Sequence, residues 1–318
     1  MRINTAAARF PVVATAFPKR AARLAPSKPV DVFEFPKAKS AKENIGWLTR
    51  NTTGNDQTAN FENLYAQVKS GKSVLPSNAK DNVYVTVQGL FGKHYPGYMG
   101  ENERALKAQG LTVKSAPVDT DVGIEANAKA LRDFVMKQEK PVVLIGHSMG
   151  GLDITAAISL YPELKDRVRA VVTLQTPHGG TPIASDLQND AGSKKFVDGV
   201  LQDVLHGDAR AMSDLSYEAR QQFVAAHPYP AGIPTVTLGS SVERKVSLVG
   251  VGRDYMKAKY GIASDGMVPE ADSYLPGAKW IRLTGMDHAG AGIADPFKLQ
   301  SHAAGALTVA AVAVALQK

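Results

Sequence analysis

Residues 142–151 read Val-Val-Leu-Ile-Gly-His-Ser-Met-Gly-Gly and form the most informative pattern in this chain of 318 residues. The apolar run Val142–Ile145 is typical of a buried strand, and a helical pattern begins at Leu152. Glycines on both sides of Ser148 let the chain turn sharply without steric clashes. The stretch therefore predicts a strand, a tight turn with Ser148 at its tip, and a helix.

This turn suits a nucleophilic serine. The start of the following helix directs backbone N–H groups and the positive end of the helix dipole toward the space beside Ser148, where an oxyanion would form. A plain structural turn is the alternative interpretation, because glycine and serine are common residues. The strand and the helix are predicted independently of the motif, and this context favours Ser148 as the nucleophile of a serine hydrolase.

A serine nucleophile needs a base, usually histidine, and a carboxylate that orients the base. In enzymes built around this turn, the acid and then the histidine follow the serine along the chain. The histidines after residue 210 are His227, His288 and His302. His288 lies in a glycine-rich loop after the last predicted strand, from which a base reaches the turn, so we predict that His288 is the base.

The predicted acid is Asp265, in the segment Ser264-Asp265-Gly266-Met267-Val268. This segment lies after one predicted strand and before the last one, as the order of the triad requires. Asp-Gly pairs also occur in turns for purely structural reasons. Other acids in this part of the chain remain as alternatives: Asp254, Glu270 and Asp272.

An oxyanion hole needs two backbone N–H groups. One is expected from Met149, directly after the nucleophile, and the second from Leu90, in the glycine-rich turn 89–92 after an earlier strand. Phe91 and Val268, beside the oxyanion turn and the acid, are expected to contact the substrate. The histidines at positions 94, 147, 178 and 206 are interpreted as structural, with His94 also placed near the mouth of the site.

Strand and helix patterns alternate through the chain from residue 83 onward. Predicted strands are 83–87, 111–113, 142–145, 168–174, 234–238 and 279–283, and predicted helices are 60–70, 101–109, 122–138, 152–160 and 297–317. This alternation predicts an α/β fold with a mostly parallel central sheet and helices on both of its faces. We assign residues 41–318 to this catalytic domain.

Residues 183–232, between two predicted strands, read as helical and polar. Within them, residues 194–206 carry an apolar stripe at helical spacing. The stripe is typical of a helix packed on the sheet or of a helical cap over the active site. The position of the insertion favours the cap.

The charge of the chain is uneven. The first 30 residues hold six Lys or Arg and no acid, so only one of the +7 net charges belongs to the remainder. The basic character therefore belongs to an arm, residues 1–40, and the predicted domain gives no sign of nucleic-acid binding. The arm is typical of either an export segment or a surface-docked tail, and we expect export by a non-classical route rather than a cytoplasmic location.

Composition restricts the chemistry further. The chain has no cysteine, which excludes disulfides, thiolate catalysis and cysteine-bound zinc. The apolar run 303–316 has only 14 residues, too few to cross a bilayer, and is typical of a buried helix. The sequence predicts no oligomeric state.

Several motifs in order give a resemblance. The chain contains Gln88-Gly89-Leu90, the segment 146–151 quoted above, Thr176-Pro177-His178-Gly179-Gly180, Met212-Ser213-Asp214-Leu215-Ser216 and Ser264-Asp265-Gly266-Met267-Val268. From residue 83 to about residue 295 it resembles the bacterial α/β-hydrolase lipases, particularly the Pseudomonas/Burkholderia type. The resemblance implies Ser148 as nucleophile, Asp265 as acid and His288 as base, with Leu90 and Met149 at the oxyanion.

The chain departs from that family in three respects. Gln88 replaces the family's histidine, and the family's disulfide has no cysteines here. The family binds calcium through an aspartate two residues after the catalytic histidine, where this chain has Gly290, although Asp287 lies nearby. We therefore expect no cofactor.

These patterns predict a serine esterase or lipase that cleaves acyl esters through an acyl-enzyme intermediate. Its expected partner is a lipid or a small ester, with contact to a membrane surface through the basic arm. An exported phospholipase of the effector type is the alternative among enzymes. A catalytically inactive scaffold that binds a ligand or a protein is the alternative outside them.

Overall fold

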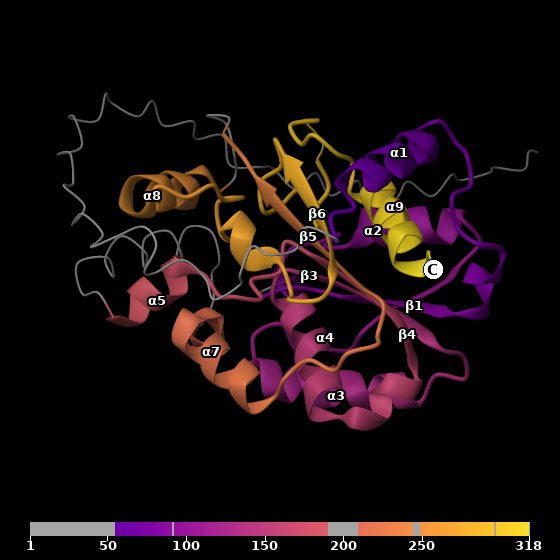
Figure 1. The fold of residues 1–318 in the computed structure, drawn as a ribbon, viewed down its shortest axis with the longest axis horizontal. Helices are drawn as coiled ribbons and strands as arrows, with labels where there is room; N and C mark the ends of the chain where they lie inside the picture. The colour runs from indigo at the N-terminus through magenta and orange to yellow at the C-terminus, as the bar shows by residue number, and fades with distance from the viewer. Residues whose placement is uncertain (1–54, 91, 190–208, 244–248, 296, 318) are drawn as a thin grey trace, which may run out of the picture. The chain divides into compact units, whose positions relative to one another are not determined.

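The computed structural model describes residues 55–90, 92–189, 209–243, 249–295 and 297–317. At the centre of these residues lies a six-stranded sheet in the order β2-β1-β3-β4-β5-β6, and all neighbouring strands are parallel (Figure 1). The strands are β1 (Val83–Val87), β2 (Thr112–Ser115), β3 (Val142–His147), β4 (Val168–Leu174), β5 (Thr235–Ser241) and β6 (Lys279–Thr284). The predicted parallel sheet is confirmed.

The central strands read as continuous apolar runs because both faces of the sheet are covered. Every residue of β1, β3 and β5 is buried, and β4 exposes only Arg169. The shorter edge strand β2 is mostly exposed. Since all strands run in one direction, their carboxyl ends meet at one edge of the sheet, the usual place for a ligand site in such folds.

Helices cover both faces of the sheet (Figure 1). On one face lie α3 (Ile124–Met136) and α4 (Met149–Leu160), which pack against each other and, through α4, on β1 and β3. On the other face lie α1 (Thr58–Lys69), α2 (Gly100–Ala108) and α9 (Ala304–Leu316). Among the described residues, no helix has the length and apolar character needed to span a membrane.

The observed helices differ from the prediction in two respects. The last helix begins at Ala304 rather than at residue 297, because the preceding segment is fixed by other contacts: Ser301 donates its backbone N–H to the Gly285 carbonyl, at 3.1 Å. Lys298, with φ of 52°, is also incompatible with a helix. The helix α8 (Gly250–Tyr260), between β5 and β6, was not predicted.

The insertion between β4 and β5 contains α5 (Pro182–Asn189), a short 3-10 helix Ala209–Leu215, and α7 (Tyr217–Ala226). The carboxylate of Asp186, on α5, accepts hydrogen bonds from the hydroxyls of Tyr255 and Tyr260, which ties α5 to α8. The helix predicted at 194–206 and the arm predicted at 1–40 lie outside the described residues.

Candidate active site

Ser148 lies directly between β3 and α4, at the carboxyl edge of the sheet. Its backbone has φ of 55°, a left-handed conformation that residues with a side chain rarely adopt. A backbone hydrogen bond fixes this turn next to β4: the Ser148 N–H donates to the Leu174 carbonyl at the end of β4, at 2.9 Å. Strain of this kind concentrates at functional positions, where the surrounding structure enforces it.

A close helix–strand contact also shapes this turn. A Cβ atom on Gly150 would overlap the carbonyl oxygens of Val87 and Gln88, at the end of β1. Only glycine lets the start of α4 approach β1 this closely. Gly150 therefore allows the nucleophile to lie near the segment that follows β1, where an oxyanion donor is expected.

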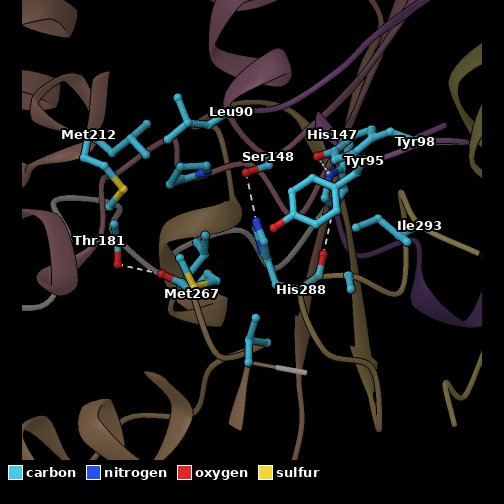
Figure 2. Close-up of a pocket in the computed structure, with 15 residues that line it drawn as sticks. Leu90, Tyr95, Tyr98, His147, Ser148, Thr181, Met212, Met267, His288 and Ile293 are labelled. Carbon is cyan, nitrogen blue, oxygen red and sulfur yellow. Dashed lines mark hydrogen bonds between the residues drawn. The ribbon is translucent and has the colours of Figure 1, made fainter. Parts of the chain in front are cut away.

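The structure brings the three predicted triad residues together (Figure 2). The Ser148 hydroxyl lies 2.8 Å from Nε2 of His288, and Nδ1 of His288 lies 2.9 Å from Oδ2 of Asp265. These contacts form one chain of hydrogen bonds from carboxylate to hydroxyl. Ser148 and His288 both line the same cavity, so the reactive end of the chain is accessible to a ligand.

Asp265 is fully buried, and every oxygen of its carboxylate has a partner. Oδ1 accepts the backbone N–H groups of Met267 and Val268, at 2.9 and 2.8 Å, which leaves Oδ2 for the imidazole of His288. The Asp265 carbonyl also accepts the N–H of His288, at 2.9 Å. Acid and histidine are therefore joined through both side chains and backbone.

The alternative acids are used elsewhere. Asp254 is exposed on α8, Glu270 pairs with Arg282 at 2.5 Å, and Asp272 accepts the Tyr217 hydroxyl at 2.8 Å. Of the predicted and alternative acids, Asp265 is the one beside His288.

The expected oxyanion donors lie on two sides of the serine. Met149 is the first residue of α4, so its N–H has no acceptor within the helix. Leu90 follows β1 and lines the cavity together with Ser148. Val268, predicted to contact the substrate, also lines the cavity, whereas Phe91 lies outside the described residues.

The cavity beside the Ser148 hydroxyl has a volume of about 290 Å³ and a mostly apolar lining (Figure 2). Its apolar lining residues come from the segment after β1, the insertion, and the loops that carry the acid and the histidine: Leu90, Pro177, Met212, Leu215, Val249, Met267, Val268, Ala289 and Ile293. Tyr95, Tyr98 and Thr181 complete the wall. His94, interpreted as structural with a place at the mouth as the alternative, pairs with Asp121 at 3.1 Å.

Sequence reasoning assigned His147 no role beyond structure and did not identify Tyr98 or Gln175. His147 is buried, and burial followed by the nearby His288 lowers its pKa to about 3, so the ring is neutral. Its Nδ1 lies 2.5 Å from the Tyr98 hydroxyl, and its Nε2 lies 3.1 Å from Oε1 of Gln175. Neither Tyr98 nor Gln175 belongs to a recognisable motif, so only the fold reveals them.

The region of the histidine does not fit the calcium ion that the resembled family binds. Gly290 offers no side-chain ligand at the expected position, and Oδ1 of Asp287 accepts a hydrogen bond from the side-chain amide of Gln300 at 2.7 Å. Within the described residues, no three His, Cys, Asp or Glu side chains gather as a metal site.

Two sequence comparisons match parts of the chain. Residues 128–209 match the PGAP1-like alpha/beta domain. A GPI inositol-deacylase of the yeast Kluyveromyces lactis is 28% identical over 124 residues, which make up 39% of this chain and only 12% of the yeast protein. The residues that match the family include Ser148 and α4.

Solved structures resemble the chain over a larger part of its length. A metagenomic carboxyl esterase has a TM-score of 0.63 and 21% identity, and the match covers 76% of each chain. The mature lipase of Bacillus licheniformis has a TM-score of 0.57 and 23% identity, over 67% of this chain and 86% of that one. The chain has the α/β-hydrolase fold. The narrower resemblance to Pseudomonas/Burkholderia lipases stays a prediction.

Proposed function

We propose that the chain is a serine carboxylic-ester hydrolase that cleaves acyl esters with an apolar acyl chain. The observation that carries the proposal is the hydrogen-bond chain from Asp265 through His288 to Ser148, which ends at an apolar cavity. A serine paired with an oriented imidazole is the arrangement that acyl transfer requires.

In the proposed reaction, Ser148 Oγ attacks the ester carbonyl carbon while Nε2 of His288 takes the hydroxyl proton. The Asp265 carboxylate holds the proton on Nδ1 and stabilises the imidazolium. The N–H groups of Leu90 and Met149 bind the oxyanion. The alcohol leaves with the proton from Nε2, and water activated by His288 then releases the acid from Ser148.

The lining of the cavity favours a substrate with an uncharged, apolar acyl group. Among the described residues that line it, the ionisable side chains apart from the tyrosines are His147 and His288. The first is neutral, and the second is bound to Ser148 and Asp265. A carboxylate or an ammonium group on the acyl chain would lose its water there without gaining a partner, at a cost of several kcal/mol.

The yeast relative suggests a narrower candidate within this class. Its name, GPI inositol-deacylase, describes removal of an acyl group from inositol. We propose deacylation of a lipid with a polar head group as the second candidate. Hydrolysis of acylated inositol lipid in vesicles, measured beside a plain triacylglycerol, separates this candidate from a general lipase.

The first experiment is hydrolysis of p-nitrophenyl esters of increasing acyl length by the wild type and by Ser148→Ala. We expect activity that rises with chain length and is lost in the variant, because the nucleophile is removed. Ser159→Ala, also on α4, is the matched control. Activity on acetate alone would indicate an esterase that does not use the apolar cavity, and full activity of Ser148→Ala would contradict the proposal.

A fluorophosphonate probe separates an enzyme from an inactive scaffold. Labelling needs an activated serine, so the wild type should be labelled and Ser148→Ala should not. A wild type that resists labelling would favour the scaffold.

A further inference from the structure

We propose that Tyr98 and His147 form a second hydrogen-bond chain, which positions the base His288 relative to the oxyanion segment. The proposal rests on the hydrolase function proposed above and adds two positioning residues to it. Figure 2 shows both side chains to the right of Ser148 and His288. Neither touches the reacting hydroxyl in the structure, so they act through their neighbours.

The chain begins at the segment after β1. The side-chain amide of Gln88 donates to the Tyr98 carbonyl at 3.3 Å, and the Tyr98 hydroxyl lies against the backbone of Gly89, next to the proposed donor Leu90. The contact is close, since a Cβ atom on Gly89 would lie 2.6 Å from the hydroxyl oxygen and 2.8 Å from the Ser148 Cβ. Tyr98 is therefore in contact with the part of the chain that is expected to bind the oxyanion.

The direction of each hydrogen bond follows from the acceptors. Both atoms that face Nε2 of His147 are oxygen acceptors, so Nε2 donates and Nδ1 accepts the proton of the Tyr98 hydroxyl, at 2.5 Å. The neutral imidazole then carries its proton on Nε2. That N–H points at two acceptors, the carbonyl of His288 at 2.9 Å and Oε1 of Gln175 at 3.1 Å.

Gln175 completes the attachment of the loop that carries the base. It is fully buried, with φ of 52°, and follows β4 directly. Its amide nitrogen donates to the Asp287 carbonyl at 2.8 Å, and its amide oxygen accepts the Ala291 N–H at 3.3 Å. Together with His147, it holds the backbone of this loop on both sides of His288.

This arrangement couples two parts of the proposed reaction. The base must stay within hydrogen-bond reach of Ser148 Oγ while the oxyanion donors stay aimed at the substrate carbonyl. A misplacement of about 1 Å can lower the rate about 100-fold. The close contact of Gly89 with Tyr98 and the hydrogen bonds from Tyr98 through His147 to the His288 carbonyl set both positions.

The first test compares Tyr98→Phe with Tyr84→Phe. Both changes remove a buried hydroxyl. The Tyr84 hydroxyl, near the amino end of β1, donates to the Ala79 carbonyl at 2.9 Å, whereas the proposed site residues lie after the carboxyl ends of the strands. For Tyr98→Phe we expect kcat to fall about 10- to 100-fold with KM changed less than about twofold. For Tyr84→Phe we expect the wild-type kcat at a similar loss of thermal stability.

The second test changes the donor itself and does not depend on Tyr98→Phe being folded. A glutamine at position 147 brings an amide nitrogen to about the reach of Nε2, whereas an asparagine reaches only about as far as Nδ1. His147→Gln should therefore keep most of kcat and His147→Asn should lose it. Adding Tyr98→Phe to His147→Asn should cost little more, since residues acting in one chain are not additive.

Two results would overturn the proposal. One is a Tyr98→Phe variant with the kcat of Tyr84→Phe, or with a loss only in KM, which would make Tyr98 a wall of the cavity. The other is equal kcat for His147→Gln and His147→Asn. Failure of the hydrolase function itself is distinct, because the wild type would then show no Ser148-dependent turnover against which to compare these variants.

Discussion

At the scale of single residues, the two oxygens of Asp265 have different partners. Backbone N–H groups of Met267 and Val268 occupy Oδ1, and the imidazole of His288 occupies Oδ2. An ionised carboxylate accepts at both oxygens. The backbone donors therefore decide which oxygen faces the base. A group that replaces the carboxylate must accept the two backbone N–H groups at one atom and the imidazole N–H at the other.

Asp265→Asn tests this arrangement. The amide oxygen is expected to take the place of Oδ1, where two N–H groups point, so the NH2 group faces Nδ1 of His288 and forces the wrong tautomer. We expect kcat to fall by about 10³–10⁴ while the protein remains folded. The measurement is kcat together with thermal unfolding, and Asp254→Asn, an exposed acid on α8, is the control. A variant with wild-type kcat would remove Asp265 from the mechanism.

At the scale of elements, the start of α4 depends on its approach to β1. Gly150→Ala would place a methyl group on the carbonyl oxygens of Val87 and Gln88, which are backbone atoms and cannot rotate away. We expect a loss of about 1–3 kcal/mol in the free energy of unfolding and a larger loss of kcat, because the segment before Leu90 must shift.

Gly100→Ala is the matched control for that change. Gly100 begins α2, and an added Cβ would lie 3.8 Å from Nη1 of Arg104, an ordinary contact. Alanine there should be neutral or slightly stabilising in urea unfolding. Equal stability of the two variants would contradict the proposed close contact of α4 with β1.

The elements differ in how well the sequence predicts them. Strands such as Val83–Val87 and Val168–Leu174 were predicted at their observed bounds, because buried parallel strands carry an uninterrupted apolar signal. The helix α8 was missed, since its contacts to Asp186 use tyrosine hydroxyls rather than an apolar stripe. The candidate triad followed from chain order, but Tyr98 and Gln175 needed the fold.

At the scale of the whole molecule, stability includes buried ionisable groups. Asp272 lies in the 3-10 helix Glu270–Ser273, and burial raises its pKa to about 7, although the Tyr217 hydroxyl opposes the shift. Its second oxygen, Oδ1, is buried without a hydrogen-bond partner. Between about pH 4 and pH 7, the folded state therefore holds a proton that the unfolded state releases.

This proton gives a signed pH dependence. Since the folded state binds more protons in that interval, the contribution of Asp272 to the free energy of unfolding falls as pH rises. We expect the difference between wild type and Asp272→Asn to fall by up to about 1.4 kcal/mol per pH unit, in urea unfolding between pH 4.5 and pH 7. A difference that stays constant with pH would contradict a protonated Asp272.

The residues of the proposed site come from distant parts of the chain, and the parallel sheet brings them together. Its parts follow β1, β3, β5 and β6, so the residues from Leu90 to His288 meet only when these strands are side by side. No fragment that lacks one of these strands holds the full constellation. Turnover would thus report on whether the sheet is intact. Partial unfolding that separates β1 or β6 from the sheet would abolish turnover while most helices persist.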